Sequence, residues 1–175
     1  KGIEARNKYD PDRDTPTALC IGYPLIQNLA GRFYLNQIQI DESANTISIR
    51  SEFFDSIRTV HMDERDDTSS RDRTLNGYSI GRWVDDTLIV ETTRFAEHQS
   101  PYGSSSGIPS GPDKRVEERY TLSEDGTAMF IDVRLEDPDY LKEPFESRVE
   151  WSYAPKLKFH RYECDADVAA HFRSE

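Results

Sequence analysis

The stretch 76–95, with the sequence NGYSIGRWVDDTLIVETTRF, constrains the fold more than any other part of the chain. Two arms rich in β-branched and aromatic residues, 78–84 and 87–95, flank the pair Asp85-Asp86. A period of two runs through the second arm, and this period places neighbouring side chains on opposite faces of a sheet. The pattern predicts a β-hairpin with a tight turn at the two aspartates, although Asn-Gly or Asp-Gly would be a stronger turn signal.

Segments of similar composition and strand length recur along the chain, with turn signals roughly every ten residues. They are 34–40, 46–53, 56–62, 78–84, 87–95, 114–122, 127–136, 147–153 and 158–164. Such spacing is typical of an antiparallel barrel or a sandwich, and short consecutive connections favour the barrel, whose closure removes exposed sheet edges. The predicted fold class is all-β: a single antiparallel up-and-down β-barrel, lipocalin-like (calycin-like), with an irregular N-terminal extension. A sandwich is the alternative.

The same pattern sets the expected boundaries and the expected interior face. Residues 1–17 form an irregular lead-in, 18–165 the barrel and 166–175 a C-terminal tail. Alternation on two strands directs one set of residues inward: Val116, Glu118, Tyr120 and Leu122, with Met129, Ile131, Val133 and Leu135. Barrels of this size can enclose one small ligand.

Charge and hydropathy narrow the classes of partner. The net charge of -11 disfavours nucleic acid, because phosphate binding needs clustered lysine and arginine, and it equally disfavours anionic membrane surfaces. No apolar run approaches the length of about eighteen residues that a membrane-spanning helix needs. The sequence therefore predicts a small-molecule ligand, no nucleic-acid partner and no membrane insertion. It leaves the oligomeric state open.

The two cysteines, Cys20 and Cys164, lie near opposite ends of the predicted barrel domain. In an oxidising compartment a disulfide between them would join the N-terminal segment to the last predicted strand and close a very long loop. We expect this bridge. Two buried free thiols are the alternative, because the sequence does not place the two Cα atoms.

Four stretches of the chain resemble a family of exported proteobacterial proteins. They are 14–24 around Cys20, RTVHMD at 58–63, the motif GYSIGRW–DTL within 77–95, and VEERY at 116–120 together with 136–138 and 162–164. The resemblance implies a lipocalin-like barrel that is periplasmic or secreted, with a signal peptide removed ahead of Lys1. It implies no reaction. Relatives often carry a His-Pro-His-like stretch where this chain has Gly107-Ile108-Pro109-Ser110, so a mechanism based on those histidines is not expected here.

Three residues on predicted strands are candidates for catalysis. Glu118 is in phase with apolar neighbours, so its carboxylate must be paired or have a raised pKa, and Glu91 is the second carboxylate candidate. His61 could act as a general acid or base if its side of the strand lines the barrel. The alternatives are an ion pair between Glu118 and an arginine (Arg58, Arg94 or Arg148), and a solvated His61 outside the barrel.

The candidate ligand-binding residues lie on these strands or near the long loop 96–113. They are Arg58, Tyr78, His98, Tyr102, Tyr120 and Arg148. The loop is rich in serine, glycine and proline, and loops of this length are often functional lids. We expect it to cover one barrel mouth, with Tyr102 reaching the ligand. The alternative is a surface insertion without a role.

No strong catalytic or cofactor signature is present in the sequence: it lacks a nucleophile elbow, a phosphate loop, a dinucleotide fingerprint and a zinc motif. The spacing of the four histidines does not suit a metal, so no metal and no cofactor are predicted. The main hypothesis is an enzyme that performs acid–base chemistry on a small aromatic or terpenoid-like molecule, as a lyase, isomerase, cyclase or hydrolase. The alternative is a non-catalytic carrier or sensor of an apolar molecule. Ionisable side chains that converge inside the cavity would favour the enzyme.

Overall fold

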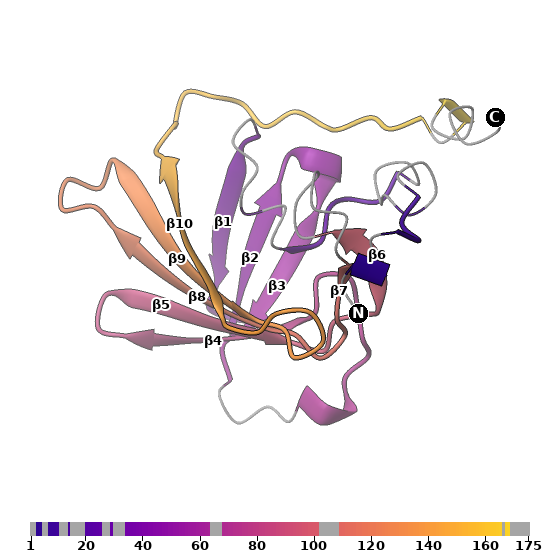
Figure 1. The fold of residues 1–175 in the computed structure, drawn as a ribbon. Coiled ribbons are helices and arrows are strands. Elements are labelled where there is room, and N and C mark those ends of the chain that lie inside the picture. Colours follow the sequence, from indigo (N-terminus) through magenta and orange to yellow (C-terminus); the bar gives the residue numbers. More distant parts are fainter. Residues whose placement is uncertain are drawn as a thin grey trace.

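The computed structural model describes residues 3–4, 7–10, 14, 20–25, 29, 34–63, 68–101, 109–165 and 167–168, with backbone alone at 98–101 and 109. Its main element is one eight-stranded sheet that curls into a half-barrel (Figure 1). In order across the sheet the strands are β1 (Asn36–Asp41), β2 (Thr46–Ser51), β3 (Ile57–His61), β4 (Tyr78–Val84), β5 (Thr87–Thr93), β8 (Arg115–Leu122), β9 (Ala128–Glu136) and β10 (Phe145–Ser152). The predicted all-β, lipocalin-like fold class is confirmed.

The remaining described elements are short. β6 (His98–Pro101) and β7 (Pro109–Ser110) form a separate two-stranded sheet, and η2 (Phe53–Asp55) and η3 (Thr68–Ser70) are single 3-10 turns. Among the described residues, no helix is long and apolar enough to cross a membrane.

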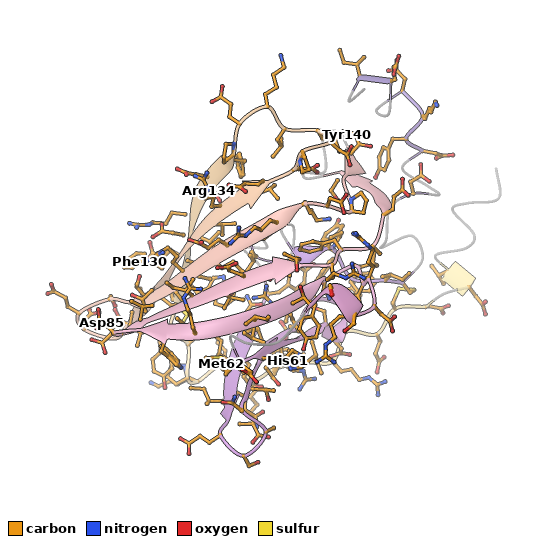
Figure 2. All side chains as sticks on the ribbon, turned by 90° about the horizontal axis from the view of Figure 1, so that it is seen from below. His61, Met62, Asp85, Phe130, Arg134 and Tyr140 are labelled. Atoms are coloured by element: carbon orange, nitrogen blue, oxygen red, sulfur yellow. A yellow bond between two sulfur atoms is a disulfide. The ribbon has the colours of Figure 1, made fainter. Side chains whose placement is uncertain are left out.

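The hairpin predicted at the two aspartates is present as β4 and β5, with Val84 paired to Thr87 across a two-residue turn. Asp85 has a φ of 50°, and aspartate tolerates this left-handed conformation better than most residues other than glycine. Figure 2 shows Asp85 at the tip of this hairpin, far from His61 and Met62 at the end of β3.

The sheet departs from a pure up-and-down barrel at β3 and β4, which pair in parallel through Val60–Ser79 and His61–Ile80. The other neighbouring strands of this sheet are antiparallel. A parallel pair needs a long connection, and residues 62–77 provide it. The order of paired strands ends at β1 and β10, which face each other across the open side of the half-barrel in Figure 1.

The core fills the concave side of the sheet and follows the predicted alternation. Val116, Glu118 and Tyr120 on β8 are buried, as are Ile131, Val133 and Leu135 on β9. The prediction that Leu122 faces inward is wrong: its side chain is 64% exposed, because β8 extends at this end beyond its last pairing with β5, which is Tyr120 with Leu88.

The strand predicted at 158–164 is also wrong, because this described stretch contains no strand. It runs as extended chain outside the sheet (Figure 1), and its backbone amides bond to side chains instead of a neighbouring strand. His160 N donates to Glu52 Oε1 at 2.7 Å and Tyr162 N donates to Asp55 Oδ2 at 3.3 Å.

A disulfide joins Cys20 to Cys164, with 5.7 Å between their Cα atoms. The predicted pairing is confirmed, and the alternative of two free thiols is wrong. A disulfide that closes a loop between residues 144 positions apart is consistent with an oxidising compartment.

Candidate functional site

Three polar side chains, Arg58, Glu118 and Tyr120, meet inside the half-barrel. Alternation on β3 turns Arg58 and Val60 inward, and alternation on β8 turns Glu118 and Tyr120 inward. In the sheet, β4 and β5 lie between these two strands. The side chains therefore meet across the interior only because the sheet curls.

The geometry of this trio is that of a closed hydrogen-bond network. Arg58 donates from Nη1 to Glu118 Oε2 at 2.6 Å and from Nη2 to Glu118 Oε1 at 3.0 Å, a bidentate arrangement. Arg58 Nη2 also donates to the Tyr120 hydroxyl at 2.9 Å, and that hydroxyl donates to Glu118 Oε1 at 2.6 Å. The three residues are 7%, 0% and 3% exposed, so water contributes little to the network.

The environment fixes the protonation state of the two donors. Burial alone would lower the pKa of Arg58, but the Glu118 carboxylate and the Tyr120 hydroxyl outweigh it and raise that pKa above its usual value. Burial, with the Glu118 charge adding to it, raises the pKa of Tyr120 well above the usual range of tyrosine. Arg58 therefore stays a cation and Tyr120 a neutral donor at neutral pH. The sequence analysis left three arginines open as partners of Glu118, and Arg58 is the one that pairs with it.

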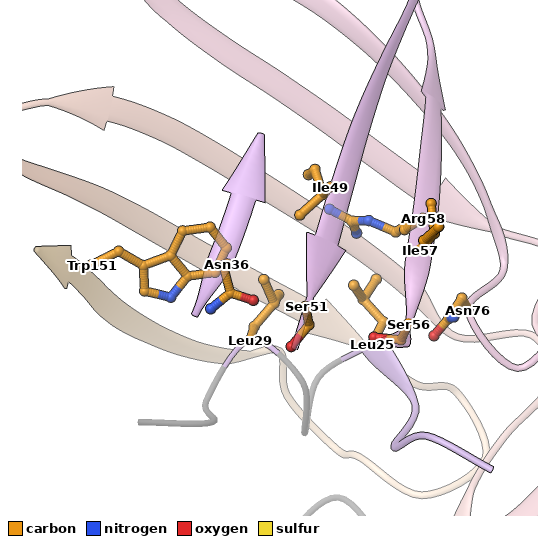
Figure 3. Close-up of a pocket in the computed structure, with 10 residues that line it drawn as sticks. All are labelled: Leu25, Leu29, Asn36, Ile49, Ser51, Ser56, Ile57, Arg58, Asn76 and Trp151. Carbon is orange, nitrogen blue, oxygen red and sulfur yellow. The ribbon is translucent and has the colours of Figure 1, made fainter. Parts of the chain in front are cut away.

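A cavity of about 30 Å³ lies beside this network, at the mouth where β1 and β3 begin and β2 ends (Figure 3). Its lining combines apolar and polar groups: Leu25, Leu29, Ile49 and Ile57 with Asn36, Ser51, Ser56, Arg58, Asn76 and Trp151. A volume of this size holds one or two water molecules and no larger ligand.

Trp151 on β10 brings an unsatisfied donor to this cavity. Its Nε1 atom is buried and has no hydrogen-bond partner among the described residues. An unmet buried donor costs about 1–3 kcal/mol, and buried polar groups are almost always paired in native proteins. One residue of the cavity lining thus carries a buried hydrogen-bond donor that has no acceptor among the described residues.

No family model, curated protein or solved structure matches the chain. The resemblance of the motifs around Cys20 and in 77–95 to the exported proteobacterial family therefore stays a prediction.

His61 lies outside the barrel. Arg58 and Val60 occupy the inward positions of β3, and the His61 ring stacks on Tyr78 from β4 with centroids 4.6 Å apart and planes 10° apart. The Arg71 guanidinium lies over the Tyr78 ring, 5.1 Å from its centroid. These residues line an open groove of about 380 Å³, together with Asn45, Met62 and others. His61 thus lies on the outer side of β3, which is the alternative stated in the sequence analysis, and its catalytic role stays a prediction.

Two further candidates lie on the outer face in ion pairs: Glu91 is half-buried and Arg148 is exposed. Glu91 accepts hydrogen bonds from Arg82 and Arg115, and Arg148 makes a bidentate pair with Asp132 at 2.6 and 2.7 Å. Neither shares a site with Glu118. Exposed pairs of this kind contribute about 0–1 kcal/mol to stability.

The two candidates of the long loop are described only in part. His98 lies in β6, without a described side chain, and Tyr102 lies outside the described residues. The lid over the barrel mouth stays a prediction. Among the described residues, no group of three or more histidine, cysteine, aspartate or glutamate side chains could hold a metal ion.

Sequence reasoning missed Leu25, Leu29, Trp151 and a buried lysine, Lys114. Lys114 Nζ donates to Ser110 Oγ at 2.9 Å and lies 4.1 Å from the centroid of the Phe95 ring. Burial lowers the pKa of Lys114 to about 8, against an opposing effect of Asp137. The signal in the sequence is weak, because a lysine that directly precedes a strand is usually solvated.

We expect the stability of the protein to rise with pH in a way that depends on Lys114. Between about pH 8 and the pKa near 10.5 of an unfolded lysine, the unfolded chain binds more protons than the folded one. The free energy of unfolding of the native protein, relative to the variant K114M, should therefore increase by up to about 3 kcal/mol from pH 7.5 to pH 10. Urea unfolding of both proteins measures this difference. A difference that is independent of pH would contradict the assignment.

Proposed function

We propose that the protein binds a small, apolar molecule that carries a hydrogen-bond acceptor, inside the half-barrel, as a carrier or sensor. The observation that supports this most directly is the unpaired Trp151 Nε1 donor at a cavity with leucine and isoleucine in its lining. Binding sites typically combine an apolar lining with a few placed polar groups. An acceptor on the ligand would satisfy the indole, and the apolar body would pack against the core.

The state of Glu118 favours binding over catalysis. A general base must accept a proton from its substrate, but both oxygens of this carboxylate already accept hydrogen bonds from Arg58 or Tyr120. Substrate would have to displace one of these donors first. The network serves better as a fixed polar wall that orients a ligand.

Acid–base catalysis is the second candidate, because Arg58, Glu118 and Tyr120 do converge inside the barrel beside the cavity. In that case Glu118 would take a proton from carbon beside a substrate carbonyl, and Arg58 or Tyr120 would stabilise the oxygen.

For either function we propose the periplasm or the cell exterior as the location, because the Cys20–Cys164 disulfide persists in oxidising compartments.

We expect ketones to bind with an affinity that depends on the hydrogen bond that the carbonyl oxygen accepts from Trp151 Nε1. The sequence has two tryptophans, so the variant W83F leaves Trp151 as the only one. Diisobutyl ketone should change its fluorescence saturably and should release measurable heat in calorimetry, whereas diisobutylmethane, the matched hydrocarbon, should bind more than about tenfold more weakly because the indole stays unpaired. Equal binding of both compounds would contradict the role of Trp151, and binding of neither ketone nor hydrocarbon would contradict the proposed function.

The same ketone separates the two candidates. In deuterated water an acid–base enzyme exchanges the hydrogens beside the carbonyl for deuterium, since Glu118 removes a proton and returns a deuteron. E118Q would then still bind the ketone but lose the exchange. Binding without exchange in the native protein would leave the carrier or sensor.

A further inference from the structure

Two side chains of the barrel core come from the segment that precedes the sheet. Leu25 and Leu29 are each 4% exposed and belong to the same core cluster as Ile49, Val60 and Tyr120. Both precede β1 in the chain, within the predicted barrel domain 18–165 but ahead of its first predicted strand. Figure 3 shows both among the residues that line the cavity, with Leu29 toward Trp151, Leu25 toward Asn76 and Ser51 drawn between them.

The size of the cavity determines what a ligand must do. With the two leucines in place, the cavity has a volume of about 30 Å³, which suffices for water only. A molecule large enough to bury a useful apolar area cannot enter beside them, because side chains in cores are close-packed. A ligand of the proposed site must therefore move these two side chains.

The chain holds the two leucines near the mouth without fixing them to the sheet. The Cys20–Cys164 disulfide anchors the segment a few residues ahead of Leu25. Neither leucine lies in a strand, and β1 and β10 beside them are not paired to each other among the described strands. Removing the leucines from the mouth therefore breaks no pairing of the sheet, and the disulfide keeps the displaced segment nearby.

We propose that Leu25 and Leu29 occupy the place of the ligand, and that the ligand is a branched aliphatic molecule of the size of their two isobutyl groups, with one carbonyl-type acceptor for Trp151 Nε1. This inference rests on the proposed function and specifies its ligand class. The leucines compete with the ligand within the same molecule. The measured association constant is therefore the intrinsic constant multiplied by the fraction of molecules in which the leucines have left the mouth.

The test compares three proteins in the W83F background: the native leucines, the double variant L25A/L29A, and L135A. Leu135 is equally buried in the core but does not line the cavity, so L135A controls for general destabilisation. Diisobutyl ketone should bind L25A/L29A about tenfold or more tightly than the protein with native leucines, and L135A should bind like the latter. Di-n-butyl ketone, the linear isomer, should bind each protein more weakly than the branched ketone.

A second measurement needs no leucine variant and covers the case in which L25A/L29A does not fold. Saturating diisobutyl ketone should speed amide hydrogen exchange at 21–25 and at residue 29 in the protein with native leucines, and should leave exchange in β9 unchanged. Slower exchange at these positions would overturn the displacement.

The outcomes separate the two proposals. Saturable binding of the ketone with equal affinity in all three proteins would overturn the displacement and leave the proposed function standing. Absence of binding in all three proteins would overturn the proposed function, and the ligand class with it.

Discussion

Replacing Arg58 with methionine is expected to lower the free energy of unfolding by about 3–5 kcal/mol, because this variant leaves a buried carboxylate without its counter-charge. Glu118 is fully buried, and Arg58 supplies two of the hydrogen bonds to its oxygens. The Tyr120 hydroxyl would remain as a donor but brings no charge. Urea unfolding at pH 7, followed by circular dichroism, measures the loss.

Two controls make this result specific to the buried pair. The double variant R58M/E118L removes both charges, so it should be more stable than R58M alone and could approach the native protein. R148M breaks an exposed bidentate pair with Asp132 and should cost no more than about 1 kcal/mol. If R58M were as mild as R148M, the Arg58–Glu118 pair would not be the buried, water-free contact described above.

Removing the disulfide with C20A/C164A should cost about 2–5 kcal/mol of stability, the usual range for a native disulfide. The bond constrains the unfolded chain, and the constraint is large because the two cysteines are 144 positions apart. For a chain of this size the melting temperature should fall by roughly 5–15 °C. Calorimetric scans of both proteins measure the shift.

Dithiothreitol provides the matched control for the disulfide. It should lower the melting temperature of the native protein by a similar amount and leave that of C20A/C164A unchanged, because the variant has no thiol or disulfide. A melting temperature that is the same with and without the reductant in the native protein would show that the bridge is absent in solution or contributes nothing.

The sequence predicted those features of the fold that depend on local patterns. Alternation on β8 and β9 predicted which residues face inward, and it predicted that Glu118 would need a partner. It did not single out Arg58, because that contact joins positions 60 residues apart and exists only when the sheet curls. The chemistry of a side chain could be read from the sequence, but its partner across the barrel could not.

Other features were missed because the local signals were balanced or absent. On β3 the inward pair, Arg58 and Val60, and the outward pair, Ile57 and Thr59, each combine one apolar and one polar residue, so alternation could not decide on which side His61 lies. The segment 158–164 has the composition of a strand but pairs with side chains instead. Leu25 and Leu29 are separated by a helix-like spacing in a region with prolines, and nothing in that pattern predicts entry into a barrel.

The Cys20–Cys164 bond also determines what happens when the backbone is cut. The whole eight-stranded sheet lies between the two cysteines, so a protease that cleaves one exposed turn, such as 123–127 between β8 and β9, produces two fragments of a single covalent molecule. Neither fragment can diffuse away, and the strands on both sides of the cut stay at high local concentration and can pair again. Release of a fragment requires reduction of the disulfide or a second cut between the two cysteines, so a single cut leaves all parts of the chain joined.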